Sequence, residues 1–323
     1  MGLSSDIIVI GAGPVGLATA ISLQRRGFSV MIIDRGGLCQ SLQDYPRHMS
    51  FFSTAANIEI AGHPFPCVNP RPTRDEALEY YRGVASKEEL NFLFYQEVHT
   101  IRGSVGEFVI GATDHELRCD RVVLATGFFH HPVPLKIVGE DLPHVSHYFD
   151  DGHRYFDQDL VIVGGANSAV IAALECFRRG ARVTLIHREK DLYSGVKYWL
   201  EPDVRNRIAE GSISAHFNTT LAEIEKDHVV IENKGSGQKK LKADFVLLMT
   251  GYRANHSWLQ SMGIELDHKN APLVEASSLE STSLKGVHLV GCALCGEDTG
   301  SIFIENGREH AQILADHLSN LSA

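Results

Sequence analysis

Short apolar runs and helical patterns alternate along the chain. Residues 7 to 10 (IIVI) form an apolar run that predicts a buried strand. Apolar residues then recur at helical spacing between positions 17 and 23, and Gly27 ends that pattern. A second run, SVMIID, predicts another strand that closes with Asp34. The order strand, helix, strand predicts a parallel α/β unit.

The same order of parts occurs a second time. An apolar run at 160–163, a glycine-rich turn, a helical pattern at 169–179 and an apolar run at 182–186 follow one another. This is an internal repeat of a whole unit. The fold class that we predict is therefore α/β, with two dinucleotide-binding, Rossmann-like domains.

The first glycine turn carries a complete fingerprint. Gly11, Gly13 and Gly16 form GxGxxG directly after the first apolar run. Glycine lets the backbone approach a pyrophosphate at a helix N-terminus, and an acid about 20 residues further on hydrogen bonds a ribose hydroxyl. A bare strand-to-helix turn would leave Asp34 unexplained, so we predict a dinucleotide site.

The second turn differs in two respects. Ala166 occupies the second glycine position, and the following strand ends in HRE instead of an acid. An arginine there suits a 2′-phosphate, which favours FAD at the first site and NADPH at the second. The alternative for Arg188 is a solvated surface charge. The predicted NADPH set is Gly164, Gly165, Ala166, Asn167, Ser168, His187 and Arg188.

Composition narrows the class of protein. Six cysteines in 323 residues are too few for a disulfide framework, and the start of the chain lacks signal-peptide features, so we expect a reducing cytoplasm. No apolar run approaches the roughly 20 residues of a membrane span. The net charge of -10 argues against a nucleic-acid binder. The histidine pairs lack ligand companions, so no metal site is expected.

Two apolar segments that run into a Thr-Gly turn, DRVVLATGFF and ADFVLLMTGYRAN, flank the second repeat. We interpret them as the two crossings between domains. The predicted FAD domain is discontinuous, at 1–144 and 255–323, and the NADPH domain at 145–254 is inserted into it.

These residues show a resemblance to known flavoproteins. Ala125 to Gly127 (ATG), the paired glycine turns and the HRE strand end resemble the low-molecular-weight thioredoxin reductase class. Within it, YPRHMSFFSTAANIEIAG, KYWLEPDVRNRIAEGSI and IFIENGREHA are similar to the bacillithiol disulfide reductase family. The resemblance implies a cytoplasmic, homodimeric FAD enzyme that uses NADPH to reduce the disulfide of a small thiol.

The resemblance also implies which residues contact FAD. It implies a last helix that begins near Ile302 and points its N-terminus at the flavin. Phe51 has two open interpretations, a flavin contact or a core residue. The implied FAD set is Gly11, Gly13, Pro14, Val15, Gly16, Asp34, Arg35, Gly37, Leu38, Tyr45, Phe51, Val98, Ala125, Thr126, Gly127, Gly291 and Ile302.

The chain departs from these families in three places. The stretch HYFDDG lacks the CxxC that thioredoxin reductases carry before the second glycine turn, which makes thioredoxin an unexpected substrate. Val15 stands where the bacillithiol reductase family has a cysteine that is thought to face the disulfide. Cys292 follows Gly291 where many members of the wider class have an Asp that holds a ribityl hydroxyl.

No catalytic residue is assigned from the sequence, but three thiols are candidates. Cys292 and Cys295 form a CxxC that could be a redox dithiol or could pack as small apolar side chains. Cys39 lies in the loop after Asp34 and has the same two interpretations. Packing is the favoured interpretation for all three.

The electron acceptor stays open among several classes. A small-thiol disulfide leads, and the alternatives are ferredoxin or flavodoxin, as for an NADPH reductase of that type, or artificial acceptors, as for a general NADPH diaphorase. The chain stops directly after its last helical pattern, which counts against a ferredoxin reductase with a C-terminal extension. An alternative from another class is a non-catalytic redox sensor that binds FAD and NADPH.

Overall fold

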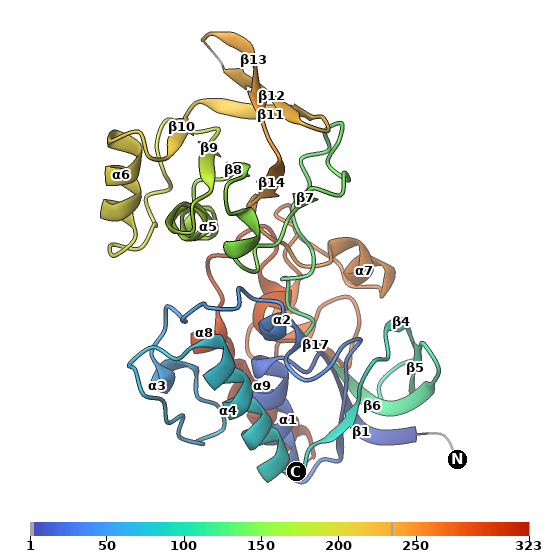
Figure 1. Cartoon of the computed structure of the whole chain (residues 1–323). Coiled ribbons are helices and arrows are strands. Elements are labelled where there is room, and N and C mark those ends of the chain that lie inside the picture. Colours follow the sequence, from blue (N-terminus) through green and yellow to red (C-terminus); the bar gives the residue numbers. More distant parts are fainter. Residues whose placement is uncertain (1–2, 234, 323) are drawn as a thin grey trace. The chain divides into compact units, whose positions relative to one another are not determined.

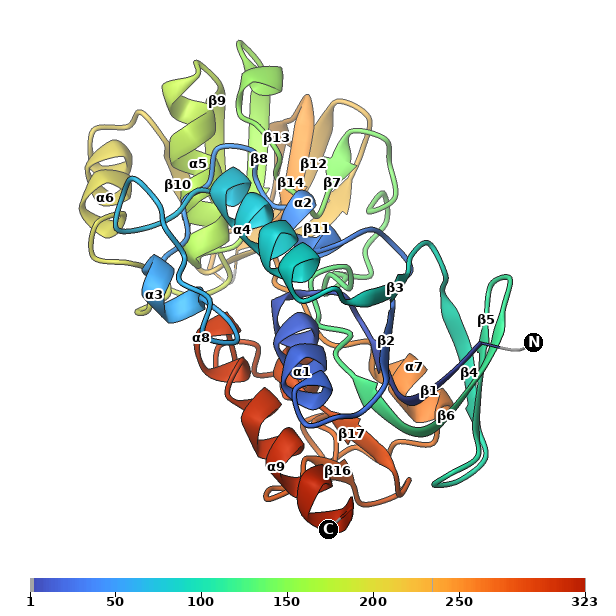
Figure 2. The ribbon, with the colours of Figure 1, turned by 90° about the horizontal axis from the view of Figure 1, so that it is seen from below.

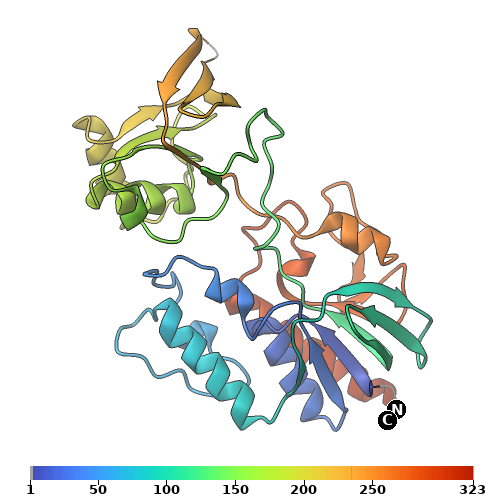
Figure 3. The same cartoon turned by 45° about the vertical axis from the view of Figure 1, so that its right-hand side comes forward.

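The computed structural model describes residues 3–233 and 235–322, and within them the chain forms two compact units (Figure 1). The first unit comprises Met1–His131 and Tyr252–Ala323, and the second comprises Pro132–Gly251. The chain leaves the first unit after His131 and returns to it at Tyr252 (Figure 3).

The first unit is built on a sheet of nine strands in the order β15-β16-β17-β6-β1-β2-β3; in addition, β5 pairs with β6, and β4 pairs with β5. The central strand β1 is parallel to both β2 and β6, and β17 is parallel to β6. The C-terminal segment therefore completes the sheet that the N-terminal segment begins. The strands are β1 (Leu3–Ile10), β2 (Val30–Ile33), β3 (Asn91–Leu93), β4 (Val98–Arg102), β5 (Phe108–Ala112), β6 (Glu116–Leu124), β15 (Val274–Glu275), β16 (Glu280–Ser281) and β17 (Val287–Leu289).

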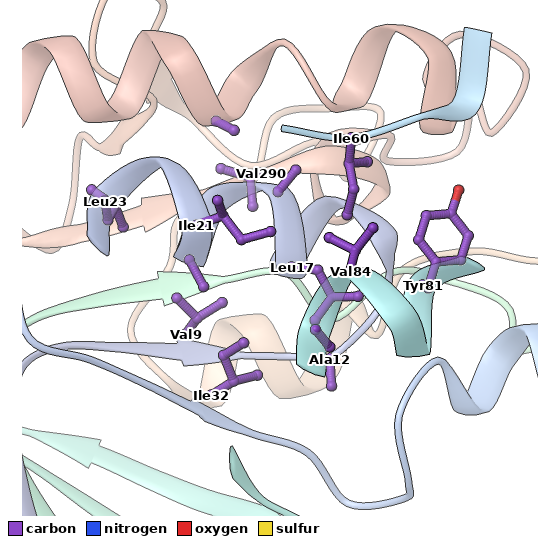
Figure 4. Close-up of a cluster of buried hydrophobic side chains, with 14 of the residues drawn as sticks. Val9, Ala12, Leu17, Ile21, Leu23, Ile32, Ile60, Tyr81, Val84 and Val290 are labelled. Carbon is purple, nitrogen blue, oxygen red and sulfur yellow. The ribbon is translucent and has the colours of Figure 1, made fainter. Parts of the chain in front are cut away.

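The helices of the first unit cover the sheet and enclose an apolar core. Helix α9 packs against α1 (Figure 2). Val9 and Ile32 of the sheet and Leu17 and Ile21 of α1 are buried together (Figure 4), and each such side chain contributes about 1.5–3 kcal/mol. The helices are α1 (Pro14–Gln24), α2 (Gln40–Gln43), α3 (Ala55–Ile58), α4 (Arg74–Lys87), α7 (His256–Ser261), the 3₁₀ turn η2 (Gly291–Leu294), α8 (Ile304–Gly307) and α9 (His310–Ser322).

The second unit holds a five-stranded parallel sheet, β10-β9-β8-β14-β7, and a three-stranded antiparallel sheet, β11-β12-β13. Helix α5 packs on β8 and β9. The elements are β7 (Val145–Ser146), η1 (His153–Tyr155), β8 (Asp159–Val163), α5 (Asn167–Arg178), β9 (Arg182–Ile186), α6 (Glu201–Ala209), β10 (Ser214–His216), β11 (Thr219–Ile224), β12 (His228–Asn233), β13 (Gly237–Lys242) and β14 (Phe245–Leu248).

The sequence predictions for both repeats are confirmed: β1, α1 and β2 form the first, and β8, α5 and β9 form the second. The unit boundary differs from the expected one. Residues 132–144 lie in the second unit because Leu135, Ile137 and Leu142 pack against its core. The other crossing falls at 251/252 instead of 254/255, since Ala254 is buried in the core of the first unit.

The expectation of one last helix from near Ile302 is wrong. The segment forms the single turn α8 and then α9, which begins at His310. Between them, Glu309 N donates to Asn306 O and Ala311 N donates to Arg308 O, so tighter i to i−3 bonds replace the helical ones. Gly307, a weak helix former, ends α8 at this point.

Candidate functional site

The first glycine turn requires glycine at two positions. Gly11 has φ of +118°, and a β-carbon there would lie 2.3 Å from the Ala125 carbonyl oxygen. A β-carbon at Gly16 would lie 2.0 Å from the carbonyl oxygen of Gly11. Gly13 is different, because it caps α1 and its β-carbon would meet nothing within 4 Å. The turn therefore holds the N-terminus of α1 against the sheet and leaves space in front of Gly13.

The second turn repeats this relationship in the other unit. Gly164 has φ of +143°, and a β-carbon there would lie 2.5 Å from the carbonyl oxygen of Met249. Ala125 and Met249 each precede a Thr-Gly pair, so the two Thr-Gly turns close against the two glycine turns in the same way. The internal repeat is thus reproduced down to single backbone contacts.

Asp34 sits directly after β2 and faces the first turn. Its carboxylate accepts hydrogen bonds from the backbone amides of Ala12 at 2.7 Å and Gly36 at 2.8 Å. These contacts fix the carboxylate beside the glycine turn, at the strand end where a ribose-binding acid is expected.

A cleft in the first unit opens in front of this turn. It spans about 1260 Å³ free of protein atoms, part of it open solvent. Most residues of the predicted FAD set line it, whereas Gly37, Leu38, Phe51 and Ile302 do not. Those that line it are Gly11, Gly13, Pro14, Val15, Gly16, Asp34, Arg35, Tyr45, Val98, Ala125, Thr126, Gly127 and Gly291.

Several residues that line the cleft belong to no motif recognised in the sequence. Gln96 and Glu97 reach it from the loop before β4, Asn255 and Trp258 from the start of α7, and Ile304 from α8. The Trp258 indole N–H donates to the Val98 carbonyl at 3.0 Å, which ties α7 to the strand. Their positions follow from the sheet order, which no local pattern encodes.

One group of missed residues had a signal in the sequence. Phe128, Phe129, His130 and His131 directly follow Gly127 and all line the cleft. The Phe129 ring meets Tyr45 edge-on at 4.6 Å between centroids. Burial, with the charge of Arg35, lowers the pKa of His131 to about 4. A polar-aromatic run after the Thr-Gly turn could therefore have been predicted as part of the site.

Phe51 and Cys39 occupy the core of the first unit. Phe51 is buried in the main apolar cluster and does not line the cleft, which favours the core interpretation. Cys39 adopts a left-handed conformation, with φ of +53°, and touches the cleft while remaining buried. Burial, with the nearby charge of Asp34, raises the pKa of the Cys39 thiol, so this thiol stays protonated and is a poor nucleophile.

Cys292 and Cys295 lie on and just after η2, and both are free thiols. Cys292 is half-buried and lines the cleft, whereas Cys295 is buried behind it. Cys292 Sγ donates to the Ile302 carbonyl at 3.2 Å, and each of the two thiols shifts the pKa of the other. The structure therefore brings Cys292 to the cleft, with Cys295 close enough to affect its protonation.

In the second unit, His187 lies over the glycine turn. A β-carbon at Gly165 would come within 2.5 Å of the His187 ring. Asn167 anchors the neighbouring loop, since its side chain donates to the Gly195 carbonyl at 3.2 Å and accepts from the Lys197 amide at 3.0 Å. Arg188 is 77% exposed and pairs with Glu189 at 3.4 Å, a weak surface contact.

The chain matches proteins of known class over nearly its whole length. The family model described as pyridine nucleotide-disulphide oxidoreductase matches residues 8–291. A relative called Bacilliredoxin reductase Bdr, from Bacillus subtilis, is 36% identical over 322 residues, 98% of each chain. A solved structure, Bacillithiol Disulfide Reductase Bdr (YpdA) from Staphylococcus aureus, is 34% identical with a TM-score of 0.95 and covers 99% of this chain and 100% of its own. Thioredoxin reductase from T. acidophilum, at 21% identity and a TM-score of 0.78, shares the fold.

The chain belongs to the pyridine nucleotide-disulphide oxidoreductase family and is an oxidoreductase that uses FAD and a nicotinamide nucleotide. Within that family it groups with the bacillithiol disulfide reductases, as the sequence predicted. The predictions of fold class, enzyme class and redox cofactors are thereby confirmed, and the alternative of a non-catalytic sensor is set aside. Across residues 3–233 and 235–322, no helix is long and apolar enough to span a membrane, and no three His, Cys, Asp or Glu side chains gather as metal ligands.

Proposed function

We propose that this oxidoreductase uses NADPH and FAD to reduce the disulfide of a small thiol of the bacillithiol type. The observation that carries the proposal is the pair of matching glycine turns with opposite chemistry at the strand ends. Asp34 follows the first turn, and His187 and Arg188 follow the second. One turn thus suits an unmodified ribose and the other a 2′-phosphate.

The cleft of the first unit fits FAD. Gly13 offers space for a pyrophosphate beside the N-terminus of α1, and Asp34 stands at the ribose position. Tyr45, Phe129 and Trp258 supply aromatic surface further along the cleft. When bound, the flavin supplies hydride acceptance from a nicotinamide and electron transfer to an acceptor. The protein residues position it and exclude water; Phe51, Gly37, Leu38 and Ile302 lie outside the lining and act at most indirectly.

The second turn fits NADPH. Gly164 to Ser168 would hold the pyrophosphate at the N-terminus of α5, and Arg188, exposed at the end of β9, is free to turn from Glu189 to a phosphate. NADPH oxidation compared with NADH oxidation at equal concentrations tests this part. Equal kcat/KM for the two nucleotides would remove the assignment.

The acceptor class follows from the relatives. Proteins named bacillithiol disulfide reductase share 33–34% of their residues with this chain over nearly full length, whereas relatives named Ferredoxin--NADP reductase share 24–26%. The deciding experiment measures NADPH oxidation with bacillithiol disulfide, cystine, glutathione disulfide, an oxidised bacilliredoxin, ferredoxin and a quinone. Turnover of the first acceptor well above the rest supports the proposal. Preference for ferredoxin would replace it, and turnover of the quinone alone would leave a diaphorase.

We also infer a homodimer in a reducing cytoplasm, which rests on the resemblance and on the low cysteine content. The acidic net charge of -10 disfavours a nucleic-acid partner. Light scattering of the FAD-loaded protein tests the dimer, and a monomer mass at micromolar concentration would contradict it.

A further inference from the structure

The CxxC at η2 meets the geometric demands of a reversible disulfide. Cys295 N donates to Cys292 O at 3.2 Å, which curls the segment into a turn and puts the two side chains on one side. Residues three apart on a helical turn have β-carbons about 5–6 Å apart, and a disulfide needs about 3.5–4.5 Å, so closure requires a small shift only. In the reduced protein, Cys292 Sγ donates to the Ile302 carbonyl at 3.2 Å, and the two thiols are near enough to shift one another's pKa.

The two thiols differ in access. Cys292 lines the cleft, and its side chain neighbours Tyr45, whose pKa is raised by burial and by the charge that Cys292 would carry. Cys295 is 5% exposed and lies behind Cys292, against the segment that leads to α8. A molecule in the cleft can therefore reach the sulfur of Cys292 but not that of Cys295.

The surroundings favour one negative charge on the pair. The Cys292 thiol lowers the pKa of Cys295 by a hydrogen bond, and the Ile302 backbone and the Ser301 side chain add to this effect. The pKa of Cys292 is raised by the same shared hydrogen bond and by burial. Burial of Cys295 opposes the lowering of its pKa, but of the two thiols Cys295 is the one that gives up its proton first.

The other cysteines lack these properties. Burial raises the pKa of Cys119 and Cys176 to about 12 and raises that of Cys39 above its usual range. The pKa of Cys292 is raised too, but these three thiols, unlike Cys292, have no cysteine three residues away in the chain to take up the proton, so they behave as protonated hydrophobes. Cys67 donates to the Asn69 carbonyl at 2.8 Å outside the cleft. Of the six cysteines, all of which are described, Cys292 and Cys295 are the two that lie three residues apart in the chain.

We propose that Cys292 and Cys295 form a redox-active dithiol, in which Cys292 attacks the disulfide substrate in the cleft and Cys295 resolves the mixed disulfide. This assignment rests on the proposed function, since it takes the same class of substrate. The glycine turn of this chain carries Val15, which cannot form a disulfide. The dithiol supplies the reactive sulfur instead.

The cycle balances in atoms and electrons. Cys292 attacks one sulfur of RSSR, passes its proton to the Cys295 thiolate, forms Cys292–S–S–R and releases RS⁻. Cys295 then attacks the Cys292 sulfur, which forms the Cys292–S–S–Cys295 bond and releases RSH with the Cys295 proton. A hydride equivalent from the reduced nicotinamide, two electrons and one proton, converts the closed pair back to one thiol and one thiolate.

The first test is an anaerobic reductive titration of the oxidised, FAD-loaded protein. Four electrons per FAD, with two additional free thiols after reduction, are the expected result. Uptake of two electrons with no change in thiol count would overturn the proposal. A peptide map of the oxidised protein should show Cys292 linked to Cys295 with a mass loss of two hydrogens, and both cysteines alkylated in that sample would contradict it.

Variants separate the two roles. Cys295→Ser should trap the substrate as a mixed disulfide on Cys292, seen as a mass increase of one RS group, and Cys292→Ser should form no adduct. Both should lose disulfide turnover on the order of 100-fold or more. Cys67→Ser is the matched control and should behave as the native chain. Cys292→Ala, read by FAD content and circular dichroism, distinguishes a folding defect from loss of the thiol.

The outcomes also distinguish this proposal from the proposed function. If Cys292→Ser reduced a small disulfide as fast as the native chain, the proposed function would stand and the proposed dithiol would be refuted. The opposite outcome is a Cys292–Cys295 disulfide that forms with an oxidant and is reduced by NADPH, in a protein that reduces no small disulfide. In that case the dithiol would stand and the proposed substrate class would be refuted.

Discussion

The side chain of Val15 packs directly against the backbone of Gly291. A β-carbon at position 291 would lie 3.1 Å from Val15 Cγ1, and Gly291 has φ of +61°. Val15 belongs to the first glycine turn and Gly291 opens η2, so this contact joins the dinucleotide turn to the segment that carries Cys292. The fifth position of the turn thus fixes the CxxC without providing a thiol itself.

Replacing Gly291 by alanine should destabilise the first unit through two effects. The left-handed backbone costs a non-glycine residue about 1–2 kcal/mol, and the β-carbon crowds Val15. Together the two effects come to about 2 kcal/mol, and at about 2–4 °C per kcal/mol the melting temperature should fall by about 4–8 °C. Thermal unfolding followed by circular dichroism measures this change.

Gly62→Ala is the matched control for that substitution. Gly62 has φ of +73°, and its β-carbon would meet nothing within 4 Å, so only the backbone cost applies. In the double variant Val15→Ala with Gly291→Ala, the β-carbon added at position 291 no longer meets the valine side chain. The part of the stability loss that arises from crowding should therefore disappear, whereas the backbone cost remains, and a double-mutant cycle measures this difference as a coupling energy. Equal melting temperatures of Gly291→Ala and Gly62→Ala would contradict the packing argument.

Two glycines of the same fingerprint should behave in opposite ways. Gly13→Ala should fold normally and bind FAD more weakly, because its β-carbon enters the space in front of α1. Gly11→Ala should lose about 3 kcal/mol or more, because its β-carbon would overlap the Ala125 carbonyl at 2.3 Å. Soluble yield, melting temperature and FAD content after desalting measure the two effects.

Gly27→Ala serves as the control, since Gly27 has φ of +92° with open space around it. It should show a modest loss of stability and full FAD content. If Gly13→Ala bound FAD as tightly as the native chain, the assignment of the FAD pyrophosphate to this turn would be wrong.

Local patterns specified one half of the site and topology specified the other. The glycine turns and Asp34 were visible in the sequence because strand, turn and helix are contiguous and each residue type has a backbone reason. Asn255 and Trp258 were not, because they enter the cleft only after β17 has joined β6 and brought the C-terminal segment back to the sheet. The spacing of Cys292 and Cys295 was visible in the sequence, but the position of Cys292 on the cleft was not.

Arg188 should control the choice of nicotinamide nucleotide. Arg188→Ala removes the charge that we assign to a 2′-phosphate, and charge-assisted hydrogen bonds are worth about 1.5–3 kcal/mol. The ratio of kcat/KM for NADPH to that for NADH should fall by about 10-fold to 100-fold. Steady-state rates with each nucleotide and a constant acceptor give the ratio.

Arg178→Ala is the control for charge, because Arg178 ends α5, about 17 Å along the helix from the turn, and pairs with Asp203 at 2.6 Å. It should leave the ratio unchanged. A ratio that falls equally in both variants would show a general electrostatic effect instead of a phosphate contact.

His288 should make the first unit sensitive to acid. The residue is fully buried in β17, and its Nδ1 donates to the Ser278 carbonyl at 3.0 Å. Burial lowers the pKa of His288 to about 4, although the Ser278 hydrogen bond and the charge of Glu280 act to raise it. Because the unfolded chain has a pKa near 6.5, it binds a proton first as the pH falls, and stability is lost between about pH 6.5 and pH 4.

The expected loss across that window is on the order of 3 kcal/mol from this one residue. His288→Asn keeps a donor for the Ser278 carbonyl and does not titrate, so its unfolding free energy should be lower at pH 7 but flatter between pH 6.5 and pH 4. Urea unfolding at several pH values measures both slopes. His228→Asn is the control, because His228 is only half-buried in the second unit and has Asp227 and Glu225 as neighbours. An acid slope that His288→Asn leaves unchanged would show that the loss arises from other groups.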